Sequence, residues 1–276
     1  MYSKDSRLTD KRPQPVAPDR YTEEYFLTAC EGYEDFIASD GENLSRRLKA
    51  AFELAAVEPG MMVLDVACGR GEIVRHVARL GADAYGFDYA HAAIKLARGV
   101  LARDRELAQG VMALARADAK YFPYPARTFD RVLMFDIVEH LHPWELHQAL
   151  LEVRRVLKDD GRLIIHTAPN VWYDRYAYPV VRQFRRLAGQ GAGYPANPRE
   201  FLVEHNQDVH VNEQSLFGLR RVLRQAGFSG QVWLDSPPQH RQENPLLAAL
   251  RHVLFGWPPF RWFFEREVFA VAKKRL

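Results

Sequence analysis

Four aspartates of this 276-residue chain each follow or close a short apolar run, at Asp65, Asp88, Asp118 and Asp136. A carboxylate accepts hydrogen bonds and donates none, so these side chains could bind an ammonium group or a pair of hydroxyls on a ligand. Soon after the first aspartate the chain turns through Cys68-Gly69-Arg70-Gly71, and glycine lets main chain approach a ligand with no Cβ between them. The pattern predicts a ligand that lies against backbone and is held by carboxylates.

The elements that must position these residues alternate between strands and helices from residue 61 onward. Strands are predicted at Val63–Val66, Ala84–Phe87, Val111–Ala115, Arg131–Phe135 and, after a turn at Asp160-Gly161, Arg162–Thr167, with helical apolar spacing between them. A later helix is predicted at 215–226, with strands at 231–234 and 268–272. Strands separated by helices form a parallel sheet with right-handed crossovers. Such sheets bind ligands at the carboxyl ends of their strands, so the four aspartates should gather at one edge.

Three nucleotide-binding patterns compete for the glycine turn. A phosphate-binding loop needs Gly-Lys followed by Ser or Thr, which the sequence lacks. A dinucleotide fingerprint that starts at Gly69 would need its third glycine where Val74 stands. The observed order from Asp65 to Gly71, acid-x-small-x-Gly-x-Gly, resembles motif I of the class I S-adenosylmethionine (SAM) methyltransferases. The resemblance implies an α/β, Rossmann-like class I methyltransferase fold: a mostly parallel seven-stranded sheet, helices on both faces and a final antiparallel strand.

The same resemblance implies SAM as the cofactor and gives each acid a role. Asp65 would receive the methionine ammonium group, and the two oxygens of Asp88 would take the ribose hydroxyls. Asp118 would accept from the adenine amino group, beside the amide of Ala119. The other predicted cofactor-binding positions are Ala67, where the family usually has glycine, Gly69, Gly71, Asp136, and Tyr89, which with Ile137 or Phe87 could flank the adenine.

The segment from Asp136 to His140 follows the fourth predicted strand, where the family places its methyl acceptor. His140 is the predicted general base because imidazole titrates near neutral pH, and His210 is its predicted catalytic partner. Alternatively, His140 only packs and hydrogen-bonds locally. The segment is also similar to the E-x-x-E-H motif of small-RNA 2′-O-methyltransferases and ubiquinone-pathway O-methyltransferases. In that alternative Asp136, Glu139, His140 and His210 bind a divalent cation that lowers the pKa of the acceptor hydroxyl.

The domain organisation predicted from the sequence has two parts. Residues 1–56 are expected to form an N-terminal arm, loose to about residue 19, and a helical cap, and residues 57–276 the methyltransferase domain. A substrate-cap insertion at about 171–210 combines aromatic residues with arginines, which could stack on and clamp a sugar or an anionic ring. An apolar insertion is expected at about 235–264.

The acceptor is expected to be a small molecule, first a hydroxyl of a sugar, glycan precursor or natural product. N- or C-methylation and a metal-dependent RNA or quinone-type O-methyltransferase stay open. A net charge of +3 argues against DNA and gives little support for RNA. Two cysteines, no signal peptide and no long apolar run predict a cytoplasmic protein. The apolar, basic stretch 245–264 could form a homodimer face or a peripheral membrane contact, and such a binding role is the non-enzyme alternative.

Overall fold

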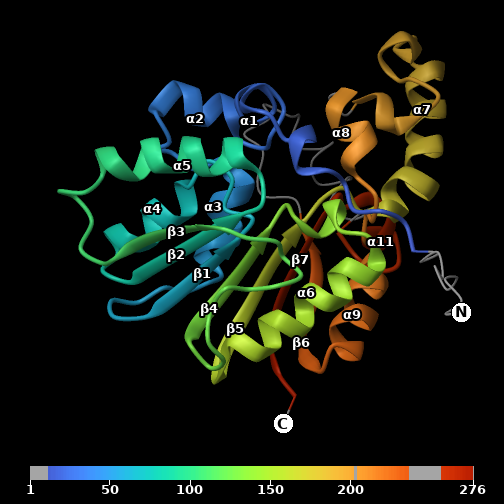
Figure 1. Cartoon of the computed structure of the whole chain (residues 1–276). Helices are drawn as coiled ribbons and strands as arrows, with labels where there is room; N and C mark the ends of the chain where they lie inside the picture. Colours follow the sequence, from blue (N-terminus) through green and yellow to red (C-terminus); the bar gives the residue numbers. More distant parts are fainter. Residues whose placement is uncertain (1–11, 202–203, 236–255, 276) are drawn as a thin grey trace, which may run out of the picture.

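A mixed seven-stranded sheet forms the centre of the protein in the computed structural model, which describes residues 12–201, 204–235 and 256–275 without the side chains of 201–206 (Figure 1). The strands lie in the order β3-β2-β1-β4-β5-β7-β6. They are β1 (Met62–Val66), β2 (Asp83–Asp88), β3 (Met112–Arg116), β4 (Phe129–Phe135), β5 (Leu157–Thr167), β6 (Phe228–Asp235) and β7 (Glu267–Lys274). β1 to β5 pair in parallel, and β7 is antiparallel to both of its neighbours. The predicted fold class is therefore confirmed, including the final antiparallel strand.

The strand order reverses at β1, because the chain builds outward to β2 and β3 on one side and to β4 and β5 on the other. Leu64 pairs with Tyr85 of β2 and with Val132 of β4, which places β1 in the middle of the parallel part. A crevice opens at such a switch point, outside the carboxyl ends of the strands. The fold therefore brings the ends of β1, β2 and β4 to the place where a ligand can bind.

The fifth strand begins earlier than predicted. β5 starts at Leu157, and its pairing with β4 shifts register between Phe129↔Leu157 and Arg131↔Arg162. The residues between these two pairs form an irregularity within the strand rather than the predicted separating turn at Asp160-Gly161. Gly161 fits this place because a Cβ there would lie 3.0 Å from the carbonyl oxygen of Phe129.

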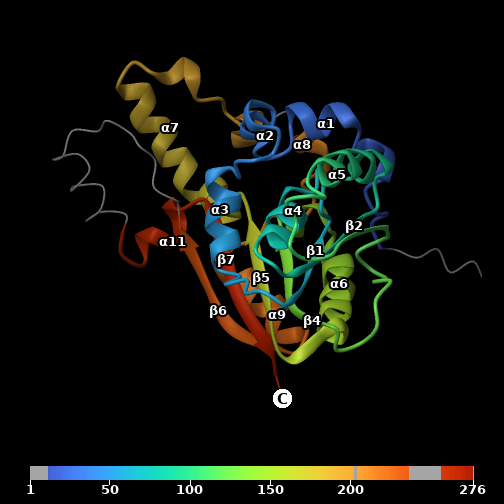
Figure 2. The ribbon, with the colours of Figure 1, turned by 90° about the vertical axis from the view of Figure 1, so that its left-hand side faces the viewer.

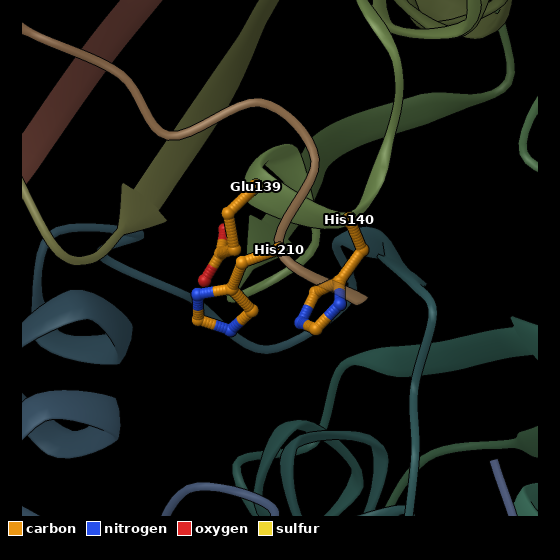
Figure 3. A group of neighbouring side chains, drawn as sticks. All are labelled: Glu139, His140 and His210. Carbon is orange, nitrogen blue, oxygen red and sulfur yellow. The ribbon is translucent and has the colours of Figure 1, made fainter. Parts of the chain in front are cut away.

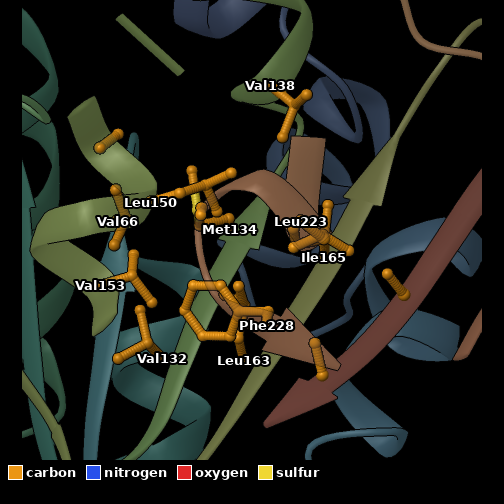
Figure 4. Packing of buried hydrophobic residues seen from close by; sticks show 14 of the residues in the cluster. Val66, Val132, Met134, Val138, Leu150, Val153, Leu163, Ile165, Leu223 and Phe228 are labelled. Atoms are coloured by element: carbon orange, nitrogen blue, oxygen red, sulfur yellow. The ribbon is translucent and has the colours of Figure 1, made fainter. Parts of the chain in front are cut away.

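Helices cover both faces of the sheet (Figure 2). On one face, α6 (Pro143–Val156) and α9 (Leu216–Gln225) pack their apolar sides on β4, β5 and β6 in one buried cluster. Figure 4 shows Leu150 and Val153 of α6 and Leu223 of α9 beside strand residues such as Val132 and Ile165. On the other face, α3 (Arg46–Glu53), α4 (Glu72–Arg79) and α5 (His91–Arg103) bury a second cluster. Burial on both faces explains the nearly continuous apolar strands.

The remaining elements lie around the carboxyl edge of the sheet. Residues 12–56 contain α1 (Glu23–Thr28), α2 (Tyr33–Ser39) and α3, with Gly32 and Gly41, at φ 72° and 74°, in the connections between these helices. The insertion after β5 contains a π-helical turn (Tyr173–Ala177), α7 (Tyr178–Leu187) and α8 (Glu204–Val209), and α11 (Phe260–Phe264) precedes β7. Among the described helices, none is long and apolar enough to cross a membrane.

Three expectations fall wholly or partly outside the described residues. They are the first part of the N-terminal arm (residues 1–11), most of the apolar insertion at 235–264, and the proposed contact segment at 245–264, of which only 256–264 is described.

Candidate active site

A deep pocket lies at the carboxyl ends of β1, β2 and β4, under the N-terminal helices. Its empty volume is about 1060 Å³, a figure that includes the solvent-open mouth. The predicted cofactor residues that line it are Asp65, Ala67, Gly69, Asp88, Tyr89, Asp118, Ala119 and Asp136, and His140 lines it as well. The sequence prediction that these residues gather at one edge of the sheet is thus confirmed.

The glycine turn joins β1 to α4 at the pocket floor. Ala67, Gly69 and Gly71 have φ values of 59°, 49° and 84°, all in the left-handed region that favours glycine. A Cβ on Gly71 would lie 2.9 Å from the Cβ of Ala97 in α5, so this glycine permits the contact between α4 and α5. A Cβ on Gly69 would meet nothing closer than 3.6 Å, so backbone conformation is what calls for glycine there. The amide of Gly69 donates to Asp88 Oδ2 at 3.2 Å.

Asp65 presents a buried carboxylate to the pocket. The residue is 5% exposed, and no hydrogen-bond donor within the described part of the chain reaches its side chain. Burial, followed by the charges of Asp88 and Glu72, raises the pKa of Asp65 well above its usual value. A buried acceptor without a donor is costly, and a ligand ammonium group would supply both the donor and the opposite charge. Asp65 therefore fits the amino-acid end of SAM.

Asp88 closes β2 with both carboxylate oxygens held in place. Oδ2 accepts from Gly69 and Oδ1 accepts from the amide of Ala90 at 2.8 Å. Burial raises the pKa of Asp88 to about 6, although these backbone hydrogen bonds lower it. Each oxygen can accept a further hydrogen bond, so the fixed carboxylate can take two neighbouring hydroxyl groups, as on a ribose.

The outer end of the pocket is formed by Asp118, Ala119 and Tyr89. Asp118 accepts from the amide of Lys120 at 2.8 Å and pairs with its ammonium group at 2.9 Å, while Lys120 also reaches Glu145 at 2.7 Å. The pairing leaves the Asp118 side chain 37% exposed, with acceptor capacity toward the pocket mouth. The residues present thus fit SAM along its length: Asp65 for the ammonium, Asp88 for the ribose and Asp118 with Ala119 for the adenine.

The arm that precedes α1 is not loose over its described part. Trp144 Nε1 donates to the carbonyl of Pro13 at 3.1 Å, and Tyr89 Oη donates to that of Val16 at 3.1 Å. An imidazole nitrogen of His142 lies 3.0 Å from the carbonyl of Gln14. These contacts hold the chain against the mouth of the pocket, and the expectation of a free arm up to about residue 19 is wrong for residues 13–16.

His140 and His210 meet at the inner end of the pocket with Glu139 beside them (Figure 3). The two imidazole rings are 4.8 Å apart and nearly perpendicular. The insertion is joined to the sheet here, because the amides of Val211 and Asn212 donate to the carbonyl of Glu139 at 2.8 and 3.0 Å. One ligand atom from each member of the trio lies within 4.8 Å of the others. The predicted contact between the two histidines is present, although His140 lines the pocket and His210 lies behind it.

Glu139 is buried within this trio. Thr167 Oγ1 donates to its Oε2 at 2.7 Å. Burial, and then the charge of Asp136, raise the pKa of Glu139 to about 7, against the lowering effect of His210. Tyr21 Oη lies 3.0 Å from His140 Nδ1. His140 thus lies between a hydroxyl and a second imidazole, with a carboxyl group of raised pKa nearby.

Asp136 lines the pocket, but its carboxylate oxygens are turned into the protein. They are buried, and Oδ1 lies 2.8 Å from His166 Nδ1 on β5, an ion-pair distance without hydrogen-bond geometry. Burial alone would raise the pKa of Asp136, yet the charge of His166, and then that of Arg47, hold it at about 2. Asp136 lies outside the trio of Glu139, His140 and His210, so the four-residue metal set reduces to three.

Several residues at the site were not predicted from the sequence. Arg70, between the two glycines, is 3% exposed and donates to the carbonyls of Phe26 and Glu31 at 2.7 and 2.6 Å and to Glu72 at 2.8 Å. It therefore connects the cofactor loop to the N-terminal helices. Its position between two glycines could have indicated this role, because an arginine that is buried there must pair with carboxylates or carbonyl oxygens.

A chain of charges below the pocket, buried at His166 and Glu267 and half-buried at Arg47 and Glu31, also carried no local signal. His166 Nε2 lies 3.4 Å from Glu267 on β7, Glu267 lies 3.9 Å from Arg47 on α3, and Arg47 pairs with Glu31 at the pocket wall. These residues come from distant parts of the sequence, so local patterns gave no indication of the chain.

Comparison with known proteins gives one family model and many relatives. Residues 64–165 match a family model described as a methyltransferase domain. The chain is 31% identical over 184 residues to the ubiquinone/menaquinone biosynthesis C-methyltransferase UbiE of Paraburkholderia phytofirmans, covering 64% of this chain and 70% of the relative. It is 29% identical over 194 residues to a demethylmenaquinone methyltransferase of Tropheryma whipplei, covering 67% and 73%.

Solved structures with the same fold are less similar in sequence. One is a putative methyltransferase in complex with the Haloferax volcanii Trm112 methyltransferase activator, with a TM-score of 0.60, 14% identity and coverage of 95% of this chain and 100% of that chain. Another is the [4+2]-cyclase SpnF, with a TM-score of 0.58, 19% identity and coverage of 95% and 98%. At these identities the likeness shows the fold alone.

Proposed function

This chain belongs to the class I SAM-dependent methyltransferases, and from that premise we propose that it methylates a hydroxyl group of a small molecule, with His140 as the general base. SAM, when bound, supplies an electrophilic methyl group on a sulfonium with a good leaving group. The protein then has to align the acceptor and, for a hydroxyl, remove its proton. The observation that carries the proposal is the placement of His140 in the wall of the cofactor pocket, within 3.0 Å of Tyr21 Oη.

The proton-transfer role rests on the neighbours of His140. Nδ1–H of the neutral ring can donate to Tyr21 Oη, 3.0 Å away, which fixes the tautomer and leaves Nε2 unprotonated as the atom that takes the acceptor proton. The ring of His210, 4.8 Å away, and the buried Glu139 lie where they can stabilise the imidazolium that forms. In this proposal His140 is catalytic, whereas Tyr21, His210 and Glu139 position it and balance its charge.

The class of acceptor is inferred from the wall beyond the cofactor residues. That wall combines the aromatic rings of Tyr21, Tyr25 and Phe26 with the carboxylate of Glu31 and the thiol of Cys30. Aromatic rings pack on the apolar faces of a ring-shaped acceptor, and carboxylates accept from its hydroxyls. A polyhydroxylated ring, as in a sugar or a glycosylated natural product, suits this mixture better than a pure hydrocarbon.

We also propose that residues 12–56 act as a cap that closes the pocket, and that the insertion at 171–210 completes the acceptor site. The cap contributes Val16, Tyr21, Tyr25, Phe26 and Glu31 to the pocket wall. The insertion contributes His210 at its end, next to His140. An enclosed reaction site excludes water and strengthens charge interactions within it.

A second candidate is methylation of a ring carbon next to a hydroxyl. It is favoured by the relatives, which carry the names of ubiquinone/menaquinone C-methyltransferases and reach 31% identity. The same base serves this reaction, because loss of the proton from a phenolic hydroxyl places negative charge on the neighbouring ring carbons. The two candidates therefore share His140 and differ in which acceptor atom faces the methyl group.

A divalent cation is a further candidate component, held by Glu139, His140 and His210. Carboxylate and imidazole ligands suit Mn²⁺ or a related metal. The ligand atoms, up to 4.8 Å apart, would have to move closer for a common metal. Binding of Mn²⁺, followed by electron paramagnetic resonance, tests this directly. A decrease in the signal of free Mn²⁺ with wild type, and no decrease with His210→Ala, supports the site. Mn²⁺ that stays free at millimolar concentration rejects it.

The acceptor proposal is tested by measuring S-adenosylhomocysteine release with three acceptor sets: sugars and glycosides, quinols and catechols, and short RNAs. Carbon-13 NMR of the labelled product then distinguishes a methoxyl group from a ring-bound methyl group. Methoxyl products from the first set support the proposal. A ring-bound methyl group from the quinol set selects the second candidate, and methylated RNA alone overturns both.

A further inference from the structure

An apolar stripe runs along the exposed side of the helix that projects from the molecule. Tyr176, Val180, Phe184 and Leu187 are spaced by four, four and three residues, which places the last three on one face of α7. Their exposed fractions are 48%, 47%, 69% and 77%. Figures 1 and 2 both show α7 extending beyond the layers of helices and sheet. Exposed apolar side chains normally occur singly, so a contiguous stripe indicates a binding surface.

The same segment is rich in arginine. Residues 171–187 contain four arginines, Arg175, Arg182, Arg185 and Arg186, and one acid, Asp174, so the segment has a net charge of 4 − 1 = +3. The whole chain has a net charge of 38 − 35 = +3, so the other residues together are neutral. Arg175, Arg185 and Arg186 are exposed. The apolar stripe is thus bordered by a segment with an excess of positive charge.

The base of the helix is fixed by aromatic contacts in which Tyr176 is the one member of the stripe that takes part, 5.7 Å from Phe263. Trp172 stacks on Phe263 of α11 at 5.2 Å and lies 5.3 Å from Phe217 of α9. Beyond this aromatic cluster, Trp257 and Phe260 are 68% and 54% exposed and extend the apolar surface at the base. Since packing at the base already holds the helix, the exposed side chains of Val180, Phe184 and Leu187 are not needed to hold it in the described part of the chain.

We propose that this surface, the stripe of α7 with its arginines and the adjoining Trp257 and Phe260, docks the protein on an anionic membrane. An amphipathic helix with a basic border and exposed aromatic residues has the composition of an interfacial membrane contact. A second copy of the chain is disfavoured, because a two-fold contact would bring two helices of charge +3 together. A nucleic acid would use the arginines and leave the aliphatic stripe without a partner. The contact therefore centres on residues 176–187 rather than on the stretch 245–264, and it does not depend on which acceptor is methylated.

The test measures co-flotation of the full-length chain with vesicles of phosphatidylcholine alone and of phosphatidylcholine with phosphatidylglycerol. Binding to the anionic vesicles is expected to exceed binding to the neutral ones by about tenfold and to fall at high salt. Phe184→Asp with Leu187→Asp should lower the bound fraction by about tenfold, because charge replaces the inserted side chains. Arg185→Glu with Arg186→Glu should remove the preference for anionic lipid.

Leu107→Asp is the matched control, since Leu107 is 59% exposed in the turn after α5 and lies outside the stripe. Its vesicle binding should equal that of the wild type. The melting temperature and the mass in solution are measured for every variant. The proposal is overturned if the wild type binds neither vesicle type. It is also overturned if the wild type is a dimer in solution and Phe184→Asp dissociates it. A large drop in melting temperature for Phe184→Asp without vesicle binding also overturns it, because the stripe would then be covered by the chain itself.

Discussion

The carboxylate of Asp136 and the imidazole of His166 lie 2.8 Å apart beneath the pocket, both removed from solvent. Asp136 has φ +50°, an uncommon conformation for a residue with a side chain. The contact turns its carboxylate oxygens away from the cofactor residues and toward β5. His166 also approaches Glu267 at 3.4 Å, so one cation lies between two acids. This arrangement fixes the orientation of Asp136, the first residue of the segment that ends at His140.

Replacing His166 by Leu should destabilise the fold strongly at pH 6. Asp136 and Glu267 would then be buried without their cation, and breaking a buried ion pair costs about 3–5 kcal/mol. Burial lowers the pKa of His166 in the fold, but the charge of Asp136 raises it, to about 10. The stability that the His166 charge contributes is therefore fully present below its unfolded pKa of 6.5 and is lost as pH rises through about 10. The pKa of Asp136, lowered from 3.8 to about 2, keeps that side chain charged above pH 4.

Urea unfolding at pH 6, 8 and 10 checks this prediction. The difference in unfolding free energy between wild type and His166→Leu should be largest at pH 6 and shrink toward pH 10. His147→Leu, an exposed histidine on α6, should change stability by less than about 0.5 kcal/mol. A difference that stays constant from pH 6 to 10 would show that His166 is neutral in the fold.

Asp88→Asn should weaken binding of S-adenosylhomocysteine by roughly 30- to 100-fold. The amide keeps the size of the side chain but loses the charge and one of two acceptor oxygens, and a hydrogen bond to a charged group contributes about 1.5–3 kcal/mol. Isothermal titration calorimetry at pH 8 measures the change. Glu106→Gln, an exposed acid after α5, serves as the control and should leave the affinity unchanged.

The same carboxylate predicts a pH dependence of cofactor binding. The pKa of Asp88 is raised from 3.8 to about 6, so the unliganded protein takes up a proton there as pH falls through 6 and gains stability from it. A protonated carboxyl accepts hydroxyl donors less well, and affinity should therefore fall below pH 6. Calorimetric titrations with S-adenosylhomocysteine from pH 5 to 8 compare the pH dependence of affinity in wild type and Asp88→Asn. An equal slope in both proteins would assign the effect to another group.

The placement of the predicted cofactor residues in one pocket followed from the sequence, whereas the residues that support them did not. Asp65, Asp88 and Asp118 end apolar strands, and this local pattern places them at one edge of a parallel sheet. His166 lies near the end of an apolar strand in the same way, but one of its two acidic partners, Glu267, comes from β7, more than 100 residues away along the chain. Residues 13–16 looked free because their hydrogen bonds use backbone carbonyls, which leave no trace in side-chain patterns.

His140→Ala should lower the rate of methyl transfer by about 100- to 10,000-fold, the range expected when a general base is removed. Binding of S-adenosylhomocysteine should be nearly unchanged, because the described polar contacts of the cofactor residues do not involve His140. The two quantities are measured as kcat with a responsive acceptor and as Kd by calorimetry. Equal rates in His140→Ala and wild type would leave the histidine with a structural role only.

Tyr21→Phe separates positioning from catalysis at the same site. The ring contacts of Tyr21 with Tyr25 and His140 can persist, whereas the hydroxyl that lies 3.0 Å from His140 is lost. We expect a loss smaller than that of His140→Ala, with a shifted pH profile of kcat because His140 loses a hydrogen-bonding partner. His147→Ala should retain the full rate and the wild-type pH profile.

Arg70→Leu should release the N-terminal helices from the cofactor loop. Its guanidinium donates to Phe26 and Glu31 in the helical segment and to Glu72 in α4, so the variant leaves two carbonyls and one buried carboxylate without a donor. We expect the amides of α1 and α2 to exchange with deuterium at least tenfold faster while those of β1 keep their protection, because opening of the cap need not unfold the sheet.

The matched control for the cap is Arg98→Leu, since Arg98 is an exposed arginine on α5. Its exchange should equal that of the wild type throughout. If Arg70 couples the cap to the cofactor loop, saturating S-adenosylhomocysteine should slow exchange in α1 and α2 of the wild type more than in Arg70→Leu. Faster exchange across β1 and α4 as well would instead assign Arg70 to the core. Unchanged exchange in α1 and α2 would show that Tyr25, Phe26 and Phe36 hold the cap by burial alone.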